Sequence, residues 1–178
     1  MDLDDASILV TGGCGQVGIA IVKHLQEHHP NSKISILDLA KPAPGHAQFI
    51  DNVTYFTGDI TSEARVKEAL EAVKPLVVFH TAGLIPQIAK RLNMHSEESY
   101  TAVNVQGTRN VLNAAKTVGT VKAFILTSSC DVVKGNSWQD LVNVNESMPI
   151  PAKFNEEYAK SKVLSSPFRC SFNLSSIS

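Results

Sequence analysis

Short apolar runs alternate with longer stretches of helical spacing along most of the chain. The apolar runs occupy residues 7–10, 33–37, 53–56, 76–79 and 123–126. Runs of this length are typical of buried strands in a parallel sheet. Helices are expected at 16–29, at 63–73, at 97–117 and in the segment that carries Tyr158 and Lys162. This alternation predicts an α/β domain with a doubly wound parallel sheet.

Two details of the expected helices follow from residue spacing. Val17, Ile21 and Leu25 recur at helical intervals in the first helix, so we expect them to face the sheet. Thr61 or Ser62 is expected to cap the second helix, because a hydroxyl there accepts a free amide of the first turn.

The turn after the first apolar run is rich in glycine and reads TGGCGQVG over residues 11–18. At a strand-to-helix turn, Gly12 permits the tight bend, Gly15 lets a pyrophosphate approach, and Gly18 lets the helix pack on the strand. The amides at the helix start and the helix dipole attract an anion. The alternative is that these glycines make an ordinary turn.

An acidic residue strengthens the phosphate-binding interpretation. Asp38 closes the second apolar run, twenty positions after Gly18. An acid at the end of the second strand binds a ribose 2′-hydroxyl in dinucleotide-binding domains. Loop, helix, strand and acid are in register, which predicts a Rossmann fold with a dinucleotide site. Asp38 also favours NAD over NADP, since it repels a 2′-phosphate, although Lys41 lies nearby.

Tyr158 and Lys162 are four residues apart, so both project from one face of a helix. A free tyrosine is a poor base at neutral pH, but a cation one turn away favours its phenolate. Tyr158 is therefore expected to take the proton of a substrate alcohol as a hydride leaves for the nicotinamide. Ser129, at the end of the fifth apolar run, is expected to donate a hydrogen bond to the substrate oxygen. The alternative is a surface pair on a charged helix.

Other polar residues have two interpretations each. His80 is either a hydrogen-bonded residue at a strand end or a cofactor contact. Asn104 is either a polar residue on a helix surface or a support for Lys162 and the cleft. Cys130 lacks a basic partner and is expected to be a small buried residue rather than a nucleophile. The pair His24 and His28 has no accompanying acid or cysteine, so no metal site is predicted.

Composition narrows the class of protein. The 178 residues are 43% hydrophobic and 19% charged, with a net charge of −1, which gives no reason to expect nucleic acid as a partner. No apolar run reaches the roughly 18 residues that span a bilayer. The acidic N-terminus lacks a secretion signal, and three widely spaced cysteines support neither disulfides nor zinc. A cytoplasmic protein is predicted.

In its motifs the chain resembles the extended short-chain dehydrogenase/reductases over about residues 5–164. Within them it is most similar to the 3β-hydroxysteroid dehydrogenase group, including the sterol-4α-carboxylate 3-dehydrogenases. The matching segments are residues 11–18, Asp38, 58–60, 77–83, 104–108, 124–129, 146–151 and the Tyr158-x-x-x-Lys162 pair.

The resemblance implies NAD-linked oxidation of the 3β-hydroxyl of a steroid or sterol to a ketone, followed by loss of carbon dioxide if a 4-carboxylate is present. It implies Ser129, Tyr158 and Lys162 as the catalytic trio. The residues expected at the cofactor are Gly12, Gly15, Gln16, Val17, Gly18, Asp38, Asp59, Ile60, His80, Ala82, Gly83, Asn104, Tyr158 and Lys162. Sugar-nucleotide epimerases and reductases share this skeleton and are the alternative. A homodimer is left open, and full-length relatives are expected at the endoplasmic reticulum membrane.

The chain departs from this family after Leu164. Residues 165–178 are rich in serine, and Pro167 would break the helix five positions after Lys162. We expect a dinucleotide-binding domain at 1–164, an irregular tail at 165–178, and a C-terminal substrate-binding region that is absent through truncation. The fifth strand would then be a sheet edge with uncovered apolar faces. A third alternative is therefore a catalytically inactive dinucleotide-binding fragment.

Overall fold

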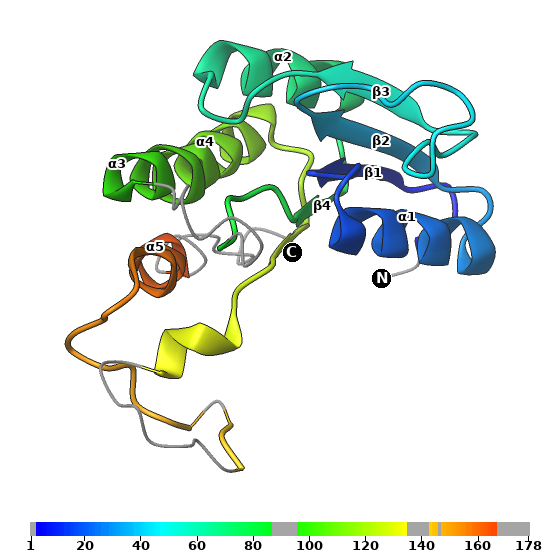
Figure 1. Cartoon of the computed structure of the whole chain (residues 1–178). Coiled ribbons are helices and arrows are strands. Elements are labelled where there is room, and N and C mark those ends of the chain that lie inside the picture. Colours follow the sequence, from blue (N-terminus) through cyan, green and yellow to red (C-terminus); the bar gives the residue numbers. More distant parts are fainter. Residues whose placement is uncertain (1–2, 87–95, 135–142, 146, 167–178) are drawn as a thin grey trace, which may run out of the picture.

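The computed structural model describes residues 3–86, 96–134, 143–145 and 147–166. Within these residues the chain forms one sheet of parallel strands in the order β3-β2-β1-β4-β5 (Figure 1). Its strands are β1 (Ser7–Thr11), β2 (Lys33–Asp38), β3 (Thr54–Thr57), β4 (Val77–His80) and β5 (Ala123–Leu126). The strand order reverses between β1 and β4, which confirms the predicted doubly wound sheet.

Helices connect the strands close to the predicted positions. They are α1 (Gln16–His28), α2 (Glu63–Val73), α3 (Glu97–Tyr100), the π-helical segment η1 (Thr101–Gly107), α4 (Thr108–Val118), the 3₁₀ helix η2 (Cys130–Val133) and α5 (Glu157–Ser165). Ser62 is the residue that caps α2, and its hydroxyl accepts the amide of Arg65 at 3.4 Å. No helix among the described residues is long and apolar enough to cross a membrane.

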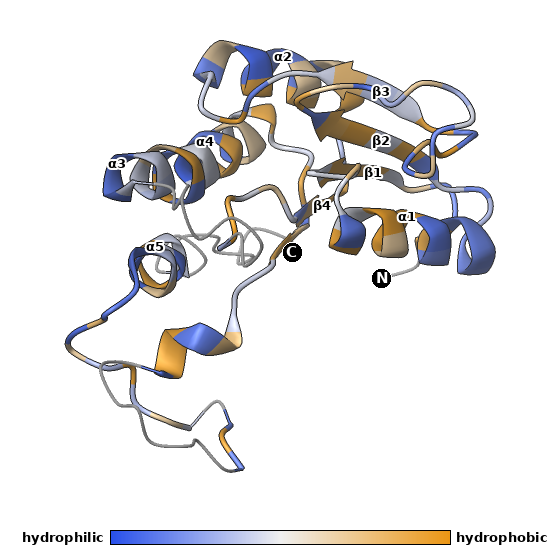
Figure 2. Ribbon diagram, viewed as in Figure 1, coloured by the Kyte–Doolittle hydropathy of each residue, from blue (hydrophilic) through white to orange (hydrophobic). Residues whose placement is uncertain are grey.

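The two faces of the sheet bury separate apolar clusters (Figure 2). On one face, Leu9, Leu37 and Val78 pack against α2 and α4. On the other face, Ile8, Val10, Ile34, Ile36 and Val77 pack against α1. Alternate residues of each strand serve the two clusters, because successive side chains of a strand point to opposite faces. The apolar runs of β1, β2 and β4 are thus buried from both sides, as in a parallel sheet.

The predicted sheet-facing stripe of α1 is confirmed at Leu25, which is buried, and at Ile21, which packs against the apolar cluster on the α1 face of the sheet, but it is wrong at Val17. Gly18, Val22 and Leu25 are the buried residues of α1, whereas 52% of the Val17 surface is exposed. Gly18 explains why Val17 is exposed. Because glycine has no side chain, the helix packs its Gly18 position closely against the end of β1, and Val17, one position earlier, is left exposed. Val17 and Ile21 line an apolar groove beside α1, together with the buried Leu25 and Phe79 of β4.

The helix expected at 97–117 has the predicted extent but not a uniform hydrogen-bond pattern. Residues 101–107 are wound as a π-helix between α3 and α4. Short π-helical segments inside α-helices frequently accompany functional sites. Asn104 lies in the middle of this segment, where it is buried.

Strand β5 is the edge of the sheet within the described residues, as predicted. Ile125 of β5 is 42% exposed, which is unusual for a β-branched side chain in the centre of a strand. The α1 side of β4 and β5 is therefore less completely covered than the side that packs against α2 and α4.

Candidate functional site

The glycine-rich turn brings β1, α1 and the end of β4 into close contact. Gly12 has a φ of 70°, and a Cβ on it would lie 2.6 Å from the amide nitrogen of Ala82. A Cβ on Gly18 would lie 2.6 Å from the Cα of Gly13 and would also collide with the carbonyl oxygen of Gly12. Only glycine fits at either position, so the turn has the close backbone approaches that the sequence motif predicts.

The N-terminus of α1 is open toward a ligand. Its N-cap residue is Gly15, which supplies no capping side chain, and the first turn contains no acidic residue. The first amides of a helix have no partner within the helix, so those of Gln16, Val17 and Gly18 are available to an anion. The side chains of Gln16 and Val17 lie on the separate apolar groove, so only their backbone points to this role.

Asp38 lies beside the glycine turn at the end of β2. Its Oδ2 accepts the amide of Cys14 at 2.8 Å, and its Oδ1 accepts the amide of Leu39 at 2.7 Å. These two bonds fix the carboxylate in place, and each oxygen keeps a further lone pair for a hydroxyl donor. Asp38 is thus held as a preorganised acceptor at the cleft.

A cleft of about 580 Å³ lies over the carboxyl ends of the strands, where a doubly wound sheet binds its ligand. Predicted cofactor residues that line it are Gly12, Gly15, Asp38, Asp59, Ile60, Ala82 and Gly83. The sequence interpretation missed several other lining residues, which belong mainly to the loop after β2: Cys14, Leu39, Ala40, Lys41, Pro42, Ala43, His46, Gln48, Leu84 and Val103. Loop residues of this kind carry no periodic signal in the sequence.

Cys14 joins the glycine turn to the loop after β2. Its carbonyl accepts the side-chain amide of Gln48 at 2.9 Å, and its thiol is 3.7 Å from the carbonyl of Ala40. Burial, together with the charge of Asp38, raises the pKa of Cys14 to about 11. The thiol therefore stays protonated at neutral pH, and it contributes to the site as a hydrogen-bonding group rather than as a nucleophile.

Tyr158 and Lys162 lie on the buried face of α5. Lys162 is 7% exposed, and its Nζ lies 5.9 Å from the centre of the Tyr158 ring. The same Nζ donates to the carbonyl of Thr127, at the end of β5, over 3.2 Å. Burial lowers the pKa of Lys162. Within the described residues the hydroxyl of Tyr158 makes no hydrogen bond, so it is available to a ligand.

Lys162 is adjacent to the cleft through Gly83. A Cβ on Gly83 would lie 3.3 Å from the Nζ of Lys162 and 3.0 Å from the Oδ1 of Asn104. Gly83 itself lines the cleft. Tyr158 and Lys162 on α5 therefore lie at the same end of the sheet as the glycine turn.

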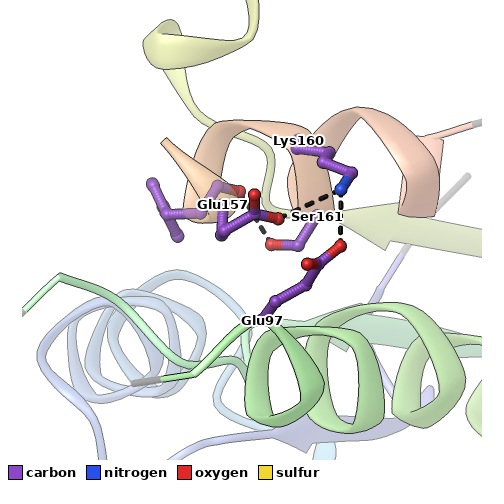
Figure 3. Close-up of polar contacts among 5 residues, drawn as sticks. Glu97, Glu157, Lys160 and Ser161 are labelled. Carbon is purple, nitrogen blue, oxygen red and sulfur yellow. Dashed lines mark hydrogen bonds and ion pairs between the residues drawn. The ribbon is translucent and has the colours of Figure 1, made fainter. Parts of the chain in front are cut away.

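Ion pairs on the surface hold α5 against α3 (Figure 3). The Nζ of Lys160 lies 2.6 Å from a carboxylate oxygen of Glu97 and 3.2 Å from one of Glu157. Lys160 thus faces α3, whereas Lys162, two residues on, is buried. The pairs raise the pKa of Lys160, and the pair with Glu97 links α5 to α3.

The structure corrects the expectation that His80 contacts the cofactor. His80 is 1% exposed, and its two ring nitrogens face the hydroxyls of Thr11 at 2.6 Å and Thr108 at 2.9 Å. Burial, with the nearby charge of Lys162, lowers the pKa of His80 to about 3. Asn104 is also buried, at 2% exposed, so its side chain supports the cleft from behind.

Ser129 lies at the predicted strand end but is engaged locally. Its hydroxyl accepts the amide of Asp131 at 3.2 Å, which caps η2, and it lies 3.3 Å from the Asp131 carboxylate. Cys130 is exposed, so the expectation that it is buried was wrong. Cys130 is the first residue of η2, which begins four positions after the last residue of β5. The described residues hold no cluster of three potential metal ligands, and His24 stacks on His28 at 4.0 Å.

Comparison with known proteins identifies the group to which this architecture belongs. Residues 9–170 match the model of the 3-beta hydroxysteroid dehydrogenase/isomerase family. The chain belongs to that family. A sterol-4-alpha-carboxylate 3-dehydrogenase (ERG26, decarboxylating) of Candida albicans is 32% identical over 88% of this chain. The 3 beta-hydroxysteroid dehydrogenase type 7 of Rattus norvegicus is 36% identical, also over 88% of this chain.

Family relatives are longer than this chain. The chain spans 43% of the length of the Candida protein and 45% of that of the rat protein. Among solved structures, the ADP-L-glycero-D-manno-heptose-6-epimerase of Helicobacter pylori is similar with a TM-score of 0.72 and 28% identity, over 95% of this chain and 52% of that one. The predicted family and fold are thus confirmed, and the chain matches about half of the relatives' length.

Proposed function

We propose that this chain is the dinucleotide-binding and proton-transferring part of an NAD-dependent dehydrogenase that oxidises the 3β-hydroxyl of a steroid or sterol to a ketone. The observation that carries the proposal is the position of Lys162. Its Nζ lies beside the cleft residue Gly83 and 5.9 Å from the ring of Tyr158, whose hydroxyl is available to a ligand. Family membership supports the oxidoreductase class.

The described residues fit a nicotinamide dinucleotide. The uncapped first turn of α1 provides amides for a pyrophosphate, and the Asp38 carboxylate provides acceptors for the hydroxyls of a ribose. A solved relative with 26% identity, the WbmH enzyme of Bordetella bronchiseptica, is described as a complex with NAD+. Asp38 also supports NAD over NADP, since a 2′-phosphate would approach its negative charge at close range.

In the proposed reaction, a bound nicotinamide would supply the hydride acceptor for the oxidation of the substrate's carbinol carbon. Tyr158 would take the hydroxyl proton, and the positive charge of Lys162 would favour the phenolate form during that transfer. Ser129 would support the substrate oxygen once its hydroxyl is released from Asp131. Decarboxylation would follow without a further residue for a 4-carboxysterol, because a β-keto acid loses carbon dioxide readily. The substrate is then a small molecule.

The test is NADH formation from NAD and a 3β-hydroxysteroid by the purified chain and by its Tyr158→Phe variant. Tyr158 packs against Tyr100 with ring centroids 6.0 Å apart, and phenylalanine preserves this packing. We expect Tyr158→Phe to bind NAD unchanged but to lower the rate by about 100-fold or more, the usual contribution of a general base. Turnover that survives this substitution would contradict the proposed role, and NAD binding without oxidation of any 3β-hydroxysteroid would contradict the proposed activity.

A further inference from the structure

His80 is part of a chain of buried hydrogen bonds that runs behind the cleft from β1 to η1. The Thr108 hydroxyl donates to the carbonyl of Asn104 at 2.6 Å. A hydroxyl has one hydrogen, so Thr108 can only accept from His80, whose Nε2 is therefore the protonated nitrogen. The Nδ1 of His80 must then accept the hydroxyl of Thr11. All three bonds run in one direction, from Thr11 to Asn104.

The Asn104 carbonyl lies where the hydrogen-bond register of the helix changes. The amide of Thr108 bonds to the carbonyl of Val105, whereas the hydroxyl of Thr108 bonds to that of Asn104. Side-chain groups satisfy backbone groups where the α-helical pattern is interrupted. His80 and Thr108 thus fix one peptide unit in the π-helical segment.

The side chain of Asn104 joins three separate parts of the site. Its Oδ1 accepts the amide of Leu84 at 2.8 Å, and its Nδ2 donates to the carbonyl of Leu84 at 3.1 Å. Nδ2 also donates to the hydroxyl of Ser161 at 2.8 Å. Leu84 lines the cleft, and Ser161 precedes Lys162 on α5. The position of Asn104 therefore determines both the cleft wall and the helix that carries the catalytic pair.

We propose that His80 is a positioning residue: through Thr108 it fixes the Asn104 peptide, and so aligns the 82–84 cleft wall with Tyr158 and Lys162. This inference rests on the proposed function. A neutral imidazole is required, because it must accept from Thr11 and donate to Thr108 at the same time. The rings of His80 and Phe124 are 5.8 Å apart, so the imidazole is enclosed from the β5 side as well.

The central variant is Thr108→Val, which removes the hydroxyl and keeps the shape of the side chain. Its matched control is Thr117→Val, since Thr117 makes the same hydroxyl-to-carbonyl bond in α4, to Asn113 at 2.9 Å, but is exposed and away from the cleft. His80→Phe removes both bonds of the imidazole. His80→Gln keeps an amide that can donate to Thr108, so it serves as the rescue variant.

NAD affinity, measured by calorimetry, is the first readout, and the tautomer of His80, measured by nitrogen NMR of the imidazole, is the second. We expect Thr108→Val to weaken NAD binding by about tenfold, or about 1.4 kcal/mol. We also expect the NMR signal of His80 Nε2–H to shift, because the hydroxyl that accepts its hydrogen bond is removed. We expect Thr117→Val to change neither. His80→Gln should bind NAD within about threefold of the unaltered chain, and His80→Phe should not.

If the Thr108→Val variant binds NAD as tightly as the unaltered chain, this inference is overturned, whether or not His80→Phe folds. The inference is also overturned if His80→Gln binds NAD no better than a folded His80→Phe variant. An unaltered chain that does not bind NAD would overturn the proposed function and this inference together, whereas the first two outcomes leave the proposed function standing.

Discussion

The two sides of the cleft are held by different forces. On the nucleotide side, the turn of β1 and α1 is fixed by backbone contacts at Gly12 and Gly18 and by apolar packing of α1 on the sheet. On the side of Tyr158 and Lys162, which we propose to be catalytic and call the catalytic side, α5 buries mainly polar side chains and is attached by hydrogen bonds and ion pairs. The nucleotide side should therefore respond to changes of volume, and the catalytic side to changes of charge, pH and salt.

The largest effect is expected from a methyl group on the nucleotide side. Gly18→Ala would place a Cβ against Gly12 and Gly13, and overpacking of this kind costs about 1–3 kcal/mol of folding free energy. Because the displaced backbone is the one that we propose binds the pyrophosphate, NAD affinity should fall by about 100-fold, or about 2.7 kcal/mol. Calorimetry and thermal unfolding measure both quantities.

Gly119→Ala is the control for that substitution. Gly119 has a φ of 72° but open space around its Cβ position, so alanine there costs about 1–2 kcal/mol of backbone strain and should leave NAD binding unchanged. Equal loss of NAD affinity in the two variants would show that stability, and not the shape of the turn, determines binding.

A smaller effect is expected from the charge at the end of β2. Asp38→Asn should lower NAD affinity by about tenfold, since a hydrogen bond to a charged group contributes about 1.5–3 kcal/mol. The affinity for NADP should change less, so the preference for NAD should narrow. Asp51→Asn, on the exposed loop before β3, is the control. An unchanged ratio of NAD to NADP affinity in Asp38→Asn would contradict the role given to Asp38.

Much of the nucleotide side was predictable from sequence because its determinants are local. The spacing from Gly12 to Gly18 and the distance to Asp38 follow from one strand-turn-helix-strand unit. The chain Thr11–His80–Thr108 was not predictable, since its members are 69 and 28 positions apart along the chain. Only the fold brings them together.

The errors have equally physical causes. Val17 was assigned to the core because helical spacing allows two neighbouring stripes, and the close contact of Gly18 selects the other one. Cys130 was expected to be buried because it lacks a basic partner, but it is the first residue of the short η2 helix and is exposed. Spacing along a sequence does not show where a helix touches its sheet or how a loop turns.

Acid should destabilise the catalytic side through His80. Its pKa is about 3 in the folded chain against 6.5 for the free side chain. The unfolded state therefore binds a proton below pH 6.5 that the folded state does not bind, so stability is complete above that pH and is lost as pH falls toward 3. The loss should approach about 1.4 kcal/mol per pH unit.

Urea unfolding between pH 7 and pH 4 measures this slope. His80→Gln should reduce this slope by the contribution of one proton, about 1.4 kcal/mol per pH unit. His24→Gln, which removes an exposed histidine of α1, should leave the slope unchanged. Equal slopes for the unaltered chain and His80→Gln would contradict the buried neutral state of His80.

The smallest effect is expected from the ion pairs of α5. Lys160→Ala removes the contacts with Glu97 and Glu157, and exposed pairs contribute little and are screened by salt. We expect NADH formation to fall by less than about twofold, with the difference vanishing at high salt. Lys67→Ala, which removes a comparable pair on α2, should have no effect on activity. A salt-independent loss in Lys160→Ala would show that Lys160 acts by another route.

The most direct test of the central claim is an amide NMR titration of the chain with NAD. If the two sides form one site, the amides of Gln16, Val17 and Gly18 should shift together with those of Gly83 and Leu84, and all should report the same dissociation constant. Glu71→Gln, near the C-terminal end of α2 and away from the cleft, should leave this pattern unchanged. Shifts confined to one side of the cleft, or different constants for the two sides, would contradict the account.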